Sequence, residues 1–304
     1  MYSWNQIVRG IKYPGLISQE ILTHVTPVSR ILYGRDDLYV TERDWDNLII
    51  LDACRYDLFK QNNILSGDLN SAWSKASNTA EFVRKTFLNK KFPDIVCVTS
   101  TPKYYKPNVE DSFYDIIHVW KNDWDPEYRT VLPDVMSKYV LNAHDKYPNK
   151  RILAHYIPPH QPFIGKTGLK MPHMVQFSGD TIQMDIDQPN IWEAIRTGLY
   201  DADDVWRAYT ENLEIVLPEI KNILQKLHGK TVVTSDHGNV FGRLREWGVI
   251  GHPPYCHIKP LIKVPWLTFD SGRRKVIKKG KVENNKKSIS PSKVEKKLSD
   301  LGYM

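Results

Sequence analysis

Short apolar runs alternate with amphipathic stretches along the chain. Buried-strand patterns occur at residues 44–52, 94–99, 151–157 and 231–235, with a further candidate at 114–119. Runs that are this short and apolar throughout are typical of strands covered on both faces of a sheet. We therefore expect these segments to form the core of a sheet.

Helical periodicity fills the gaps between these runs. The clearest stretch, residues 203–227, carries a single apolar stripe, which we interpret as core packing rather than a cofactor site. Helices are also expected to open at 55–61 and to extend over 132–144, before Pro148. Alternating strands and helices predict an α/β fold, with a mostly parallel (mixed) sheet sandwiched by helices. Ligands of such folds bind beyond the carboxyl ends of the strands.

The chain divides into three parts. Residues 1–40 form an N-terminal arm with a weak helical signal, residues 41–272 form the main domain, and residues 273–304 form a basic linker with a short helix at 292–301. Within the main domain, residues 165–190 are irregular, which is typical of an excursion over a substrate pocket. We regard this segment as a candidate lid.

Charge is unevenly distributed between these parts. The formal net charge is +7, but residues 273–304 hold eleven Lys or Arg against three acidic residues, a local net charge of +8. The remainder of the chain therefore carries about −1. A basic tail is most often a solvated linker, and we do not favour a nucleic-acid partner. Contact of the tail with an anionic membrane surface stays open.

Composition also bounds the class of protein. With 304 residues, 41% of them hydrophobic, the chain can bury the core of one large α/β domain. The longest apolar runs are far shorter than the roughly 20 residues that span a bilayer, and no apolar secretory core opens the sequence. The three scattered cysteines do not form a disulfide framework or a CxxC zinc site. We therefore predict a cytoplasmic protein, peripheral to the membrane if the tail binds there.

Two strand patterns end in a carboxylate. Asp52 ends the first and Asp236 the last, where His237 and Gly238 follow. A carboxylate ending a buried strand must be paired, capping or metal-bound, because its desolvation is costly. His237 adds a nitrogen ligand, and the glycine lets the backbone turn so that both side chains can face one ion. The alternatives are an ion pair of Asp52 with Arg55 and a capping role for Asp236.

A hydroxyl-rich segment precedes a predicted helix at residues 77–82. A hydroxyl at a helix N-terminus is well placed to attack phosphorus or sulfur, because the positive end of the helix dipole stabilises the alkoxide and the bound anion. Ser77 and Thr79 are the candidates. The alternative is that Asn78 or Thr79 merely caps the helix.

Histidines follow two of the expected strands in proline-rich turns. His155 and His160 belong to the segment HYIPPH, and His252 precedes two prolines. A single histidine in such a turn is more often structural than catalytic. Here, however, His160, His237 and His252 can converge with the two aspartates on one edge of the sheet.

The order of these motifs resembles the sulfatase-like branch of the alkaline phosphatase superfamily. The resemblance covers roughly residues 44–268, and its specificity lies in the ordered set of motifs. That set is LDACRYD at 51–57, SNTAEF at 77–82, HYIPPHQPF at 155–163, SDHGN at 235–239 and GHPPY followed by VPWL at 251–267.

The resemblance implies an alkaline-phosphatase-like catalytic domain that acts as a hydrolase or transferase on phosphate or sulfate esters. Asp52, Asp236 and His237 would bind a divalent cation (Mn, Zn, Mg or Ca), and Thr79 would attack the ester. The side chains of His160 and His252 would contact the transferred group or a second metal. The substrate would be a small-molecule or a glycan- or lipid-linked ester.

The pattern departs from the family at several positions. Sulfatases use a cysteine in a CxPSR context, which is absent here, so phosphate esters are preferred over sulfate esters. His155 is the nearest counterpart of a second-metal ligand, but it has the wrong spacing and no accompanying carboxylate. Ser77 is a fallback nucleophile, and Arg55 and Arg243 are weaker candidates for anion binding. The alternative function is a catalytically idle relative that binds an anionic glycan or lipid headgroup.

Overall fold

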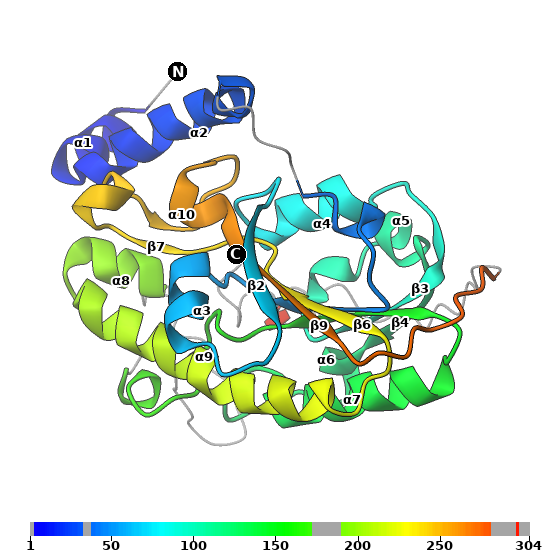
Figure 1. Cartoon of the computed structure of the whole chain (residues 1–304). Coiled ribbons are helices and arrows are strands. Elements are labelled where there is room, and N and C mark those ends of the chain that lie inside the picture. The colour runs from blue at the N-terminus through cyan, green and yellow to red at the C-terminus, as the bar shows by residue number, and fades with distance from the viewer. Residues whose placement is uncertain (1–2, 33–37, 172–189, 281–295, 298–304) are drawn as a thin grey trace.

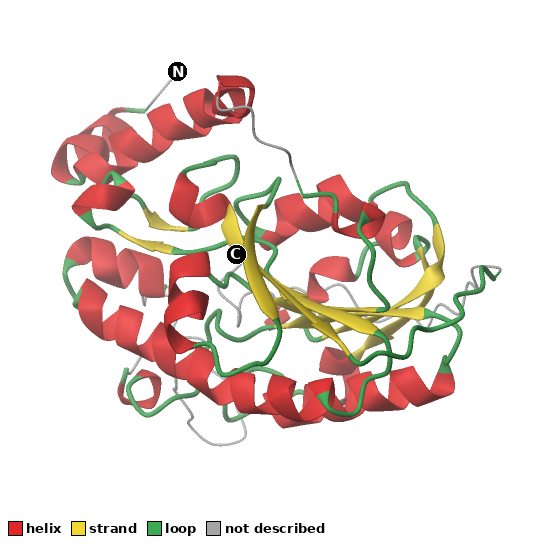
Figure 2. Ribbon diagram, in the orientation of Figure 1, coloured by secondary structure: helices red, strands yellow, loops and turns green. Residues whose placement is uncertain are grey.

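The computed structural model describes residues 3–32, 38–171, 190–280 and 296–297. Its centre is a twisted seven-stranded sheet with helices on both faces (Figures 1 and 2). The strand order is β2-β9-β6-β1-β5-β3-β4. The strands are β1 (Asn47–Leu51), β2 (Asp68–Trp73), β3 (Phe92–Thr99), β4 (Phe113–His118), β5 (Arg151–Tyr156), β6 (Lys230–Thr234) and β9 (Lys263–Asp270).

The sheet is mixed but mostly parallel. Strands β6, β1, β5, β3 and β4 pair in parallel, whereas β9 is antiparallel to both of its neighbours. A separate hairpin pairs β7 (Val240–Phe241) with β8 (Ile250–Gly251). The predicted fold class is thus confirmed, and each of the segments expected as a strand is one.

Alternation of side chains along β1 divides the core into two layers. Ile49 and Leu51 pack in one cluster, with the helices α7 and α9, whereas Leu48 and Ile50 pack in the other, with α4. Both layers are apolar because the five residues of β1 are buried on both faces. The helices of the main domain are α3 (Tyr56–Asn62), α4 (Thr79–Phe87), α5 (Pro107–Glu110), α6 (Val119–Asn122), α7 (Pro133–Lys146), α8 (Ile191–Thr197), α9 (Ala202–Leu224) and α10 (Lys259–Ile262).

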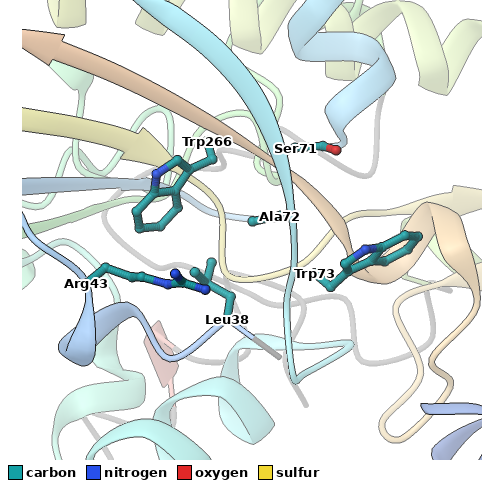
Figure 3. Close-up of a pocket in the computed structure, with 6 residues that line it drawn as sticks. All are labelled: Leu38, Arg43, Ser71, Ala72, Trp73 and Trp266. Carbon is teal, nitrogen blue, oxygen red and sulfur yellow. The ribbon is translucent and has the colours of Figure 1, made fainter. Parts of the chain in front are cut away.

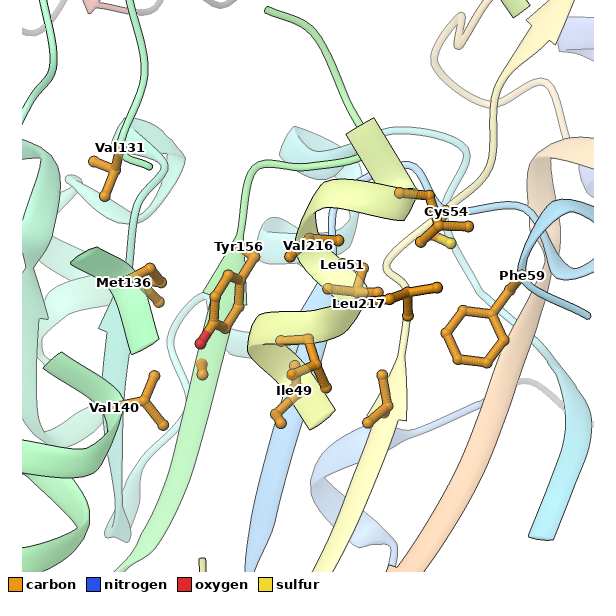
Figure 4. Packing of buried hydrophobic residues seen from close by; sticks show 14 of the residues in the cluster. Ile49, Leu51, Cys54, Phe59, Val131, Met136, Val140, Tyr156, Val216 and Leu217 are labelled. Carbon is orange, nitrogen blue, oxygen red and sulfur yellow. The ribbon is translucent and has the colours of Figure 1, made fainter. Parts of the chain in front are cut away.

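Helix α9 places its apolar stripe on the sheet, as its periodicity predicted. Val216 and Leu217 lie over Ile49 and Leu51 of β1, and Tyr156 of β5 lies beside them (Figure 4). Burial of such side chains stabilises the fold by about 1.5–3 kcal/mol each. The members of the stripe are buried except Trp206, which packs partly exposed against the cluster.

The sequence analysis missed the antiparallel edge of the sheet. β2 has a largely exposed, polar pattern. Its pairing with β9 joins residues far apart in the sequence, for example Asp68 and Thr268, which are 200 residues apart. A surface pocket of about 300 Å³ lies at this edge (Figure 3). It contains none of the expected catalytic residues and is lined by Leu38, Arg43, Ser71, Ala72, Trp73 and Trp266.

The N-terminal arm contains two helices, α1 (Trp4–Lys12) and α2 (Pro14–Leu32). Most of the candidate lid, residues 172–189, lies outside the described residues, as does all but 296–297 of the expected C-terminal helix. No helix of the described ranges combines the length and apolarity needed to cross a membrane. The proposed domain boundaries stay a prediction.

The start of the basic tail, residues 273–280, is largely exposed but makes specific contacts with the main domain. Arg274 contacts Asp44 (Nη2–Oδ1 2.6 Å) and Asp46 (Nε–Oδ2 2.5 Å), which precede β1. The backbone N–H of Lys278 donates to the carbonyl of Asn149 at 2.9 Å. The arginine fork matches the carboxylates that the chain places before β1.

His144, near the end of α7, is a buried neutral imidazole. It is 6% exposed, and its Nε2 accepts a hydrogen bond from the backbone N–H of His228 at 3.3 Å. Burial, reinforced by the charge of Lys275, lowers the pKa of His144 to about 4. The folded state therefore disfavours the proton that the unfolded chain binds at about pH 6.5.

We expect His144 to make the free energy of unfolding pH-dependent. The stabilisation is fully present above about pH 6.5 and is lost as the pH falls towards 4, because the unfolded state then binds the additional proton. The free energy of unfolding, measured in urea, should differ between pH 7 and pH 4.5 by about 2–3 kcal/mol less in His144→Gln than in the wild type. His24→Gln, at a largely exposed position, is the control. An unchanged pH dependence in His144→Gln would contradict this assignment.

Candidate active site

The expected catalytic residues meet at the carboxyl edge of three neighbouring strands. Asp52 follows β1, Asp236 follows β6 by one residue, and His155 lies near the end of β5. β1 lies between the other two strands. The Asp52, Asp236 and His155 side chains are fully buried.

Asp52, His155 and Asp236 form a group that could hold a metal ion. One ligand atom from each lies within 4.8 Å of the others. The Nε2 of His155 is 3.9 Å from Asp52 Oδ2 and 3.8 Å from Asp236 Oδ2. Neither His155 Nε2 nor Asp236 Oδ2 has a hydrogen-bond partner among the described residues. Unpaired buried polar atoms are costly, and a cation between them would satisfy both.

Backbone groups orient the Asp236 carboxylate. Its Oδ1 accepts hydrogen bonds from the backbone N–H groups of Ala53 (3.1 Å) and His237 (2.9 Å). Ala53 has a φ of 59°, so the turn after β1 adopts a left-handed conformation that points its N–H at Asp236. The arrangement leaves Oδ2 directed at the cluster.

His237 joins this group. Its Nε2 is 3.4 Å from Asp52 Oδ1 and 3.5 Å from Asp236 Oδ2, and its Nδ1 donates to the carbonyl of Gly238 at 2.7 Å. When the ring is neutral, that hydrogen bond leaves the available lone pair on Nε2. Burial opposes the charged ring, but the charges of Asp236 and Asp52 outweigh it and raise the pKa of His237 to about 9. A cation in the site would take the place of this proton.

The glycine of the DHG motif is required by packing. A Cβ at Gly238 would lie 2.1 Å from the carbonyl oxygen of Pro260, and such contacts do not occur in real side chains. The Asp52 carboxyl remains ionised: burial would raise its pKa, but the hydrogen bond and the charge of His237 hold it well below its usual range. The carboxyl pair is thus balanced by imidazoles.

Thr79 lies at the start of α4 with its hydroxyl in the cluster. Its Oγ1 is 3.1 Å from Asp52 Oδ1 and 3.1 Å from His237 Nε2. The helix is capped by Asn78, whose Oδ1 accepts from the backbone N–H of Glu81 at 2.8 Å. Capping therefore does not occupy the Thr79 side chain.

His160 and His252 form a pair beside the cluster. Their Nε2 atoms are 3.0 Å apart, and His160 Nδ1 donates to the carbonyl of Gln161 at 2.6 Å. That hydrogen bond leaves the lone pair of a neutral His160 ring on Nε2, which faces the second ring. The His252 ring centroid is 5.0 Å from that of His237. Burial lowers the pKa of both His160 and His252, so both rings are neutral at pH 7.

Asn212 of α9 holds the loop that carries His160, a role that was not predicted. Its Nδ2 donates to the carbonyls of His160 (3.1 Å) and Pro162 (2.9 Å), while its Oδ1 accepts from the N–H of Ile164 at 2.8 Å. Asn212 is fully buried within the apolar stripe of its helix. A polar residue in such a stripe is the one signal that could have identified it.

Two further residues of the site come from the 3₁₀ turn Pro102–Tyr104 after β3, and the sequence analysis missed both. The Tyr104 hydroxyl lies 2.9 Å from Nδ1 of His155. Burial lowers the pKa of Lys103 to about 8, while the opposite charge of Asp52 works to raise it. Neither residue belongs to a recognisable motif, because only the neighbouring position of β3 and β5 brings them to the site.

Several weaker sequence candidates have other partners. The Arg55 guanidinium contacts Asp57 (Nε–Oδ1 2.8 Å) and Glu246 (Nη1–Oε1 2.5 Å). These carboxylates, rather than Asp52 as in the alternative interpretation, are its ion-pair partners, and they occupy the guanidinium that was a weak candidate for anion binding. Arg243 Nη2 contacts Asp203 Oδ1 at 2.8 Å, at the beginning of α9.

Ser77 and His155 also differ from expectation. Ser77 was the fallback nucleophile. Its hydroxyl donates to the carbonyl of Pro253 at 2.7 Å and lies 3.1 Å from Glu81 Oε2, so these contacts direct the hydroxyl away from Asp52. His155 groups with both aspartates, not with a separate second-metal shell.

No protein-family model matches this chain, and no curated protein matches it. Solved structures do. The soluble domain of lipooligosaccharide phosphoethanolamine transferase A from Neisseria meningitidis is 13% identical with a TM-score of 0.47, covering 73% of this chain and 75% of that one. The periplasmic domain of a Campylobacter jejuni phosphoethanolamine transferase is 13% identical with a TM-score of 0.48, covering 74% and 78%.

A third similar structure is a protein of the alkaline phosphatase superfamily from Vibrio parahaemolyticus. It is 11% identical with a TM-score of 0.40, and the match covers 76% of this chain and 61% of that one. The chain spans about half (47%) of the full-length integral membrane transferase from Neisseria meningitidis.

We expect the Tyr104 hydroxyl to support metal binding through His155. If Nδ1–H donates to Tyr104, Nε2 keeps its lone pair for a metal, and loss of such an orienting partner typically weakens metal affinity by about 10–100-fold. Calorimetric titration of Tyr104→Phe with Mn²⁺ or Zn²⁺ should show this loss. Tyr105→Phe, one residue further along, should bind as the wild type does; equal affinities in all three proteins would refute the role.

Proposed function

We propose that this chain is a metal-dependent phosphoesterase or phosphoryl-group transferase that uses Thr79 as its nucleophile. The observation that carries the proposal is the position of Thr79 Oγ1, 3.1 Å from both Asp52 Oδ1 and His237 Nε2. The hydroxyl of a helix N-terminus therefore contacts two candidate metal ligands. That combination suits a nucleophile better than a structural threonine.

The side chains of the site fit a divalent cation. Asp52, Asp236 and His237 are the proposed ligands, and His155 contributes a fourth donor whose Nε2 is otherwise unpaired. Two carboxylates with imidazole nitrogens are a donor set that Zn²⁺ and Mn²⁺ accept. When bound, such a cation would lower the pKa of a coordinated hydroxyl and neutralise ester oxygens.

The residues of the chain would then act as follows. Asp52 accepts the Thr79 hydroxyl hydrogen bond and so aims an oxygen lone pair outwards. Thr79 Oγ1 forms a bond to phosphorus, the bond from phosphorus to the leaving oxygen breaks, and the hydroxyl proton passes to the neighbouring carboxylate of Asp52. Water or an acceptor alcohol subsequently displaces Thr79, which gives hydrolysis or transfer respectively.

The neutral imidazoles of His160 and His252 are proposed to contact the transferred group. An N–H of this pair would be redirected from the partner ring to an anionic oxygen. Lys103 is a better candidate for an anion contact than Arg55 or Arg243, because both arginines are engaged by carboxylates. We also propose that the substrate is a phosphate ester rather than a sulfate ester. Binding of a second metal and a cytoplasmic location remain proposals as well.

Mutation of the hydroxyl residues tests the nucleophile. Thr79→Ala should lower metal-dependent turnover of aryl phosphate mono- and diesters by about a thousandfold or more, because the attacking group is removed. Thr79→Ser should retain part of the activity. Ser77→Ala is the matched control two residues away, and it should remain active, since Ser77 contacts Pro253 and Glu81.

The same assay includes a chelator and re-addition of single metals. Activity that is lost with the chelator and restored by Mn²⁺, Zn²⁺, Mg²⁺ or Ca²⁺ supports the proposal and identifies the ion. Absence of turnover by the wild type with every metal, on phosphate and sulfate esters alike, would instead favour a binding protein. Loss of activity in Ser77→Ala alone would assign the nucleophile to Ser77.

A further inference from the structure

The N-terminal helices turn an apolar face towards solvent. Large apolar residues of α1 recur at helical spacing on one side, and those of α2 follow every fourth residue. We define the α1–α2 face as these residues, which are between 44% and 76% exposed: Trp4, Ile7, Val8, Ile11, Ile17, Ile21 and Val25. Close to half of the exposed large apolar residues in the described parts of the chain belong to it.

Two contacts join α1 to the rest of the protein on the side away from these apolar residues. Arg9, although 54% exposed at its side chain, has its Nη2 2.7 Å from Glu193 Oε2 of α8. Gly10 is buried and faces α2, since a Cβ there would lie 3.3 Å from Ile17 Cγ1. A surface helix ordinarily buries its apolar stripe. Here the stripe is exposed, which indicates a partner outside the described chain.

Helix α2 is fixed on the main domain through small and polar residues. A Cβ at Gly15 would lie 2.1 Å from the carbonyl oxygen of Gly248, so the two backbones are in contact. Thr26 Oγ1 accepts a hydrogen bond from the backbone N–H of His257 at 2.7 Å. The helix pair is therefore held in a defined orientation, at one corner of the molecule (Figure 1).

The neighbouring loop extends the apolar surface. It connects β7 to β8 and contacts α2 through Gly248, and its Leu244 and Trp247 are 95% and 65% exposed. Arg245 on the same loop is also exposed. The loop leads into β8 and directly on to His252 of the active site.

Charge identifies the partner that fits this surface. Residues 3–26 contain Arg9 and Lys12 but a single acidic residue, Glu20. Within the described residues, neither Lys12 nor Arg245 is recorded in a salt bridge. A helix surface with tryptophan and branched aliphatic residues, bordered by cations, has the character of helices that lie in the interface of an anionic membrane.

Other occupants fit less well. A symmetric contact between two copies would place the same cations against each other, which is unfavourable. The described part of the C-terminal tail lies elsewhere, because Lys297 Nζ is 4.8 Å from the ring centroid of Trp124, in the segment after α6 and far from α1 in Figure 1. We propose that the α1–α2 face docks the protein on an anionic lipid surface.

Vesicle flotation tests the proposal without substrate, so its outcome is independent of the phosphoesterase activity. The wild type should bind phosphatidylcholine vesicles that contain phosphatidylglycerol, and bind pure phosphatidylcholine more weakly. Ile11→Glu/Ile21→Glu should lose binding by about tenfold per isoleucine replaced. Val276→Glu, at a position as exposed as Ile11, should bind as the wild type does. Lys12→Glu/Arg245→Glu should remove the preference for anionic vesicles.

Three results would overturn the proposal. The first is a failure in the flotation assay: either the wild type binds neither type of vesicle, or the double isoleucine variant binds as well as the wild type does. The second is a concentration-dependent dimer in light scattering that the isoleucine substitutions dissociate, which assigns the face to a second copy. The third is a marked drop in the melting temperature of that variant, which shows that the chain itself covers the face.

Discussion

The pairing of two buried carboxylates, Asp52 and Asp236, governs the arrangement of the site. β1 and β6 pair in parallel with Ile50 opposite Thr234, and continuing this register by two residues brings the aspartates side by side. Two like charges excluded from water would be unstable alone. Several groups around the pair offset this instability. They are the imidazoles of His155 and His237, the Thr79 hydroxyl, and the backbone N–H groups that hold Asp236.

Much of this centre could be predicted because it depends on short-range rules. The apolar residues 48–51 of β1 are typical of a central strand that is buried on both faces, and parallel strands bring their carboxyl ends to one edge. The prediction that Asp52, Asp236 and His237 lie close together follows from that geometry alone. Thr79 was identified because its hydroxyl opens a helix, although only the structure shows that Asn78 takes the capping role.

The residues that escaped prediction act through long-range contacts. The ion pair of Arg55 with Glu246 joins positions 191 residues apart, and Asn212 holds a loop some 50 residues upstream. β2 was missed because an exposed edge strand lacks the apolar run that marks a central one. In each case the residue type is ordinary, and its role is set by what the fold places opposite it.

His155 shows why spacing along the chain is a weaker guide than the side to which a strand residue points. Its register partner is Ile50, which faces the α4 layer, so the imidazole points to the side of the sheet where α4 begins with Thr79. Tyr156, the next residue, points to the α9 layer. Because side chains alternate, His155 joins the aspartates and Tyr104 whatever its distance in sequence from His160. The same alternation that builds the two-layer core thus selects which histidine of the HYIPPH segment completes the carboxylate pair.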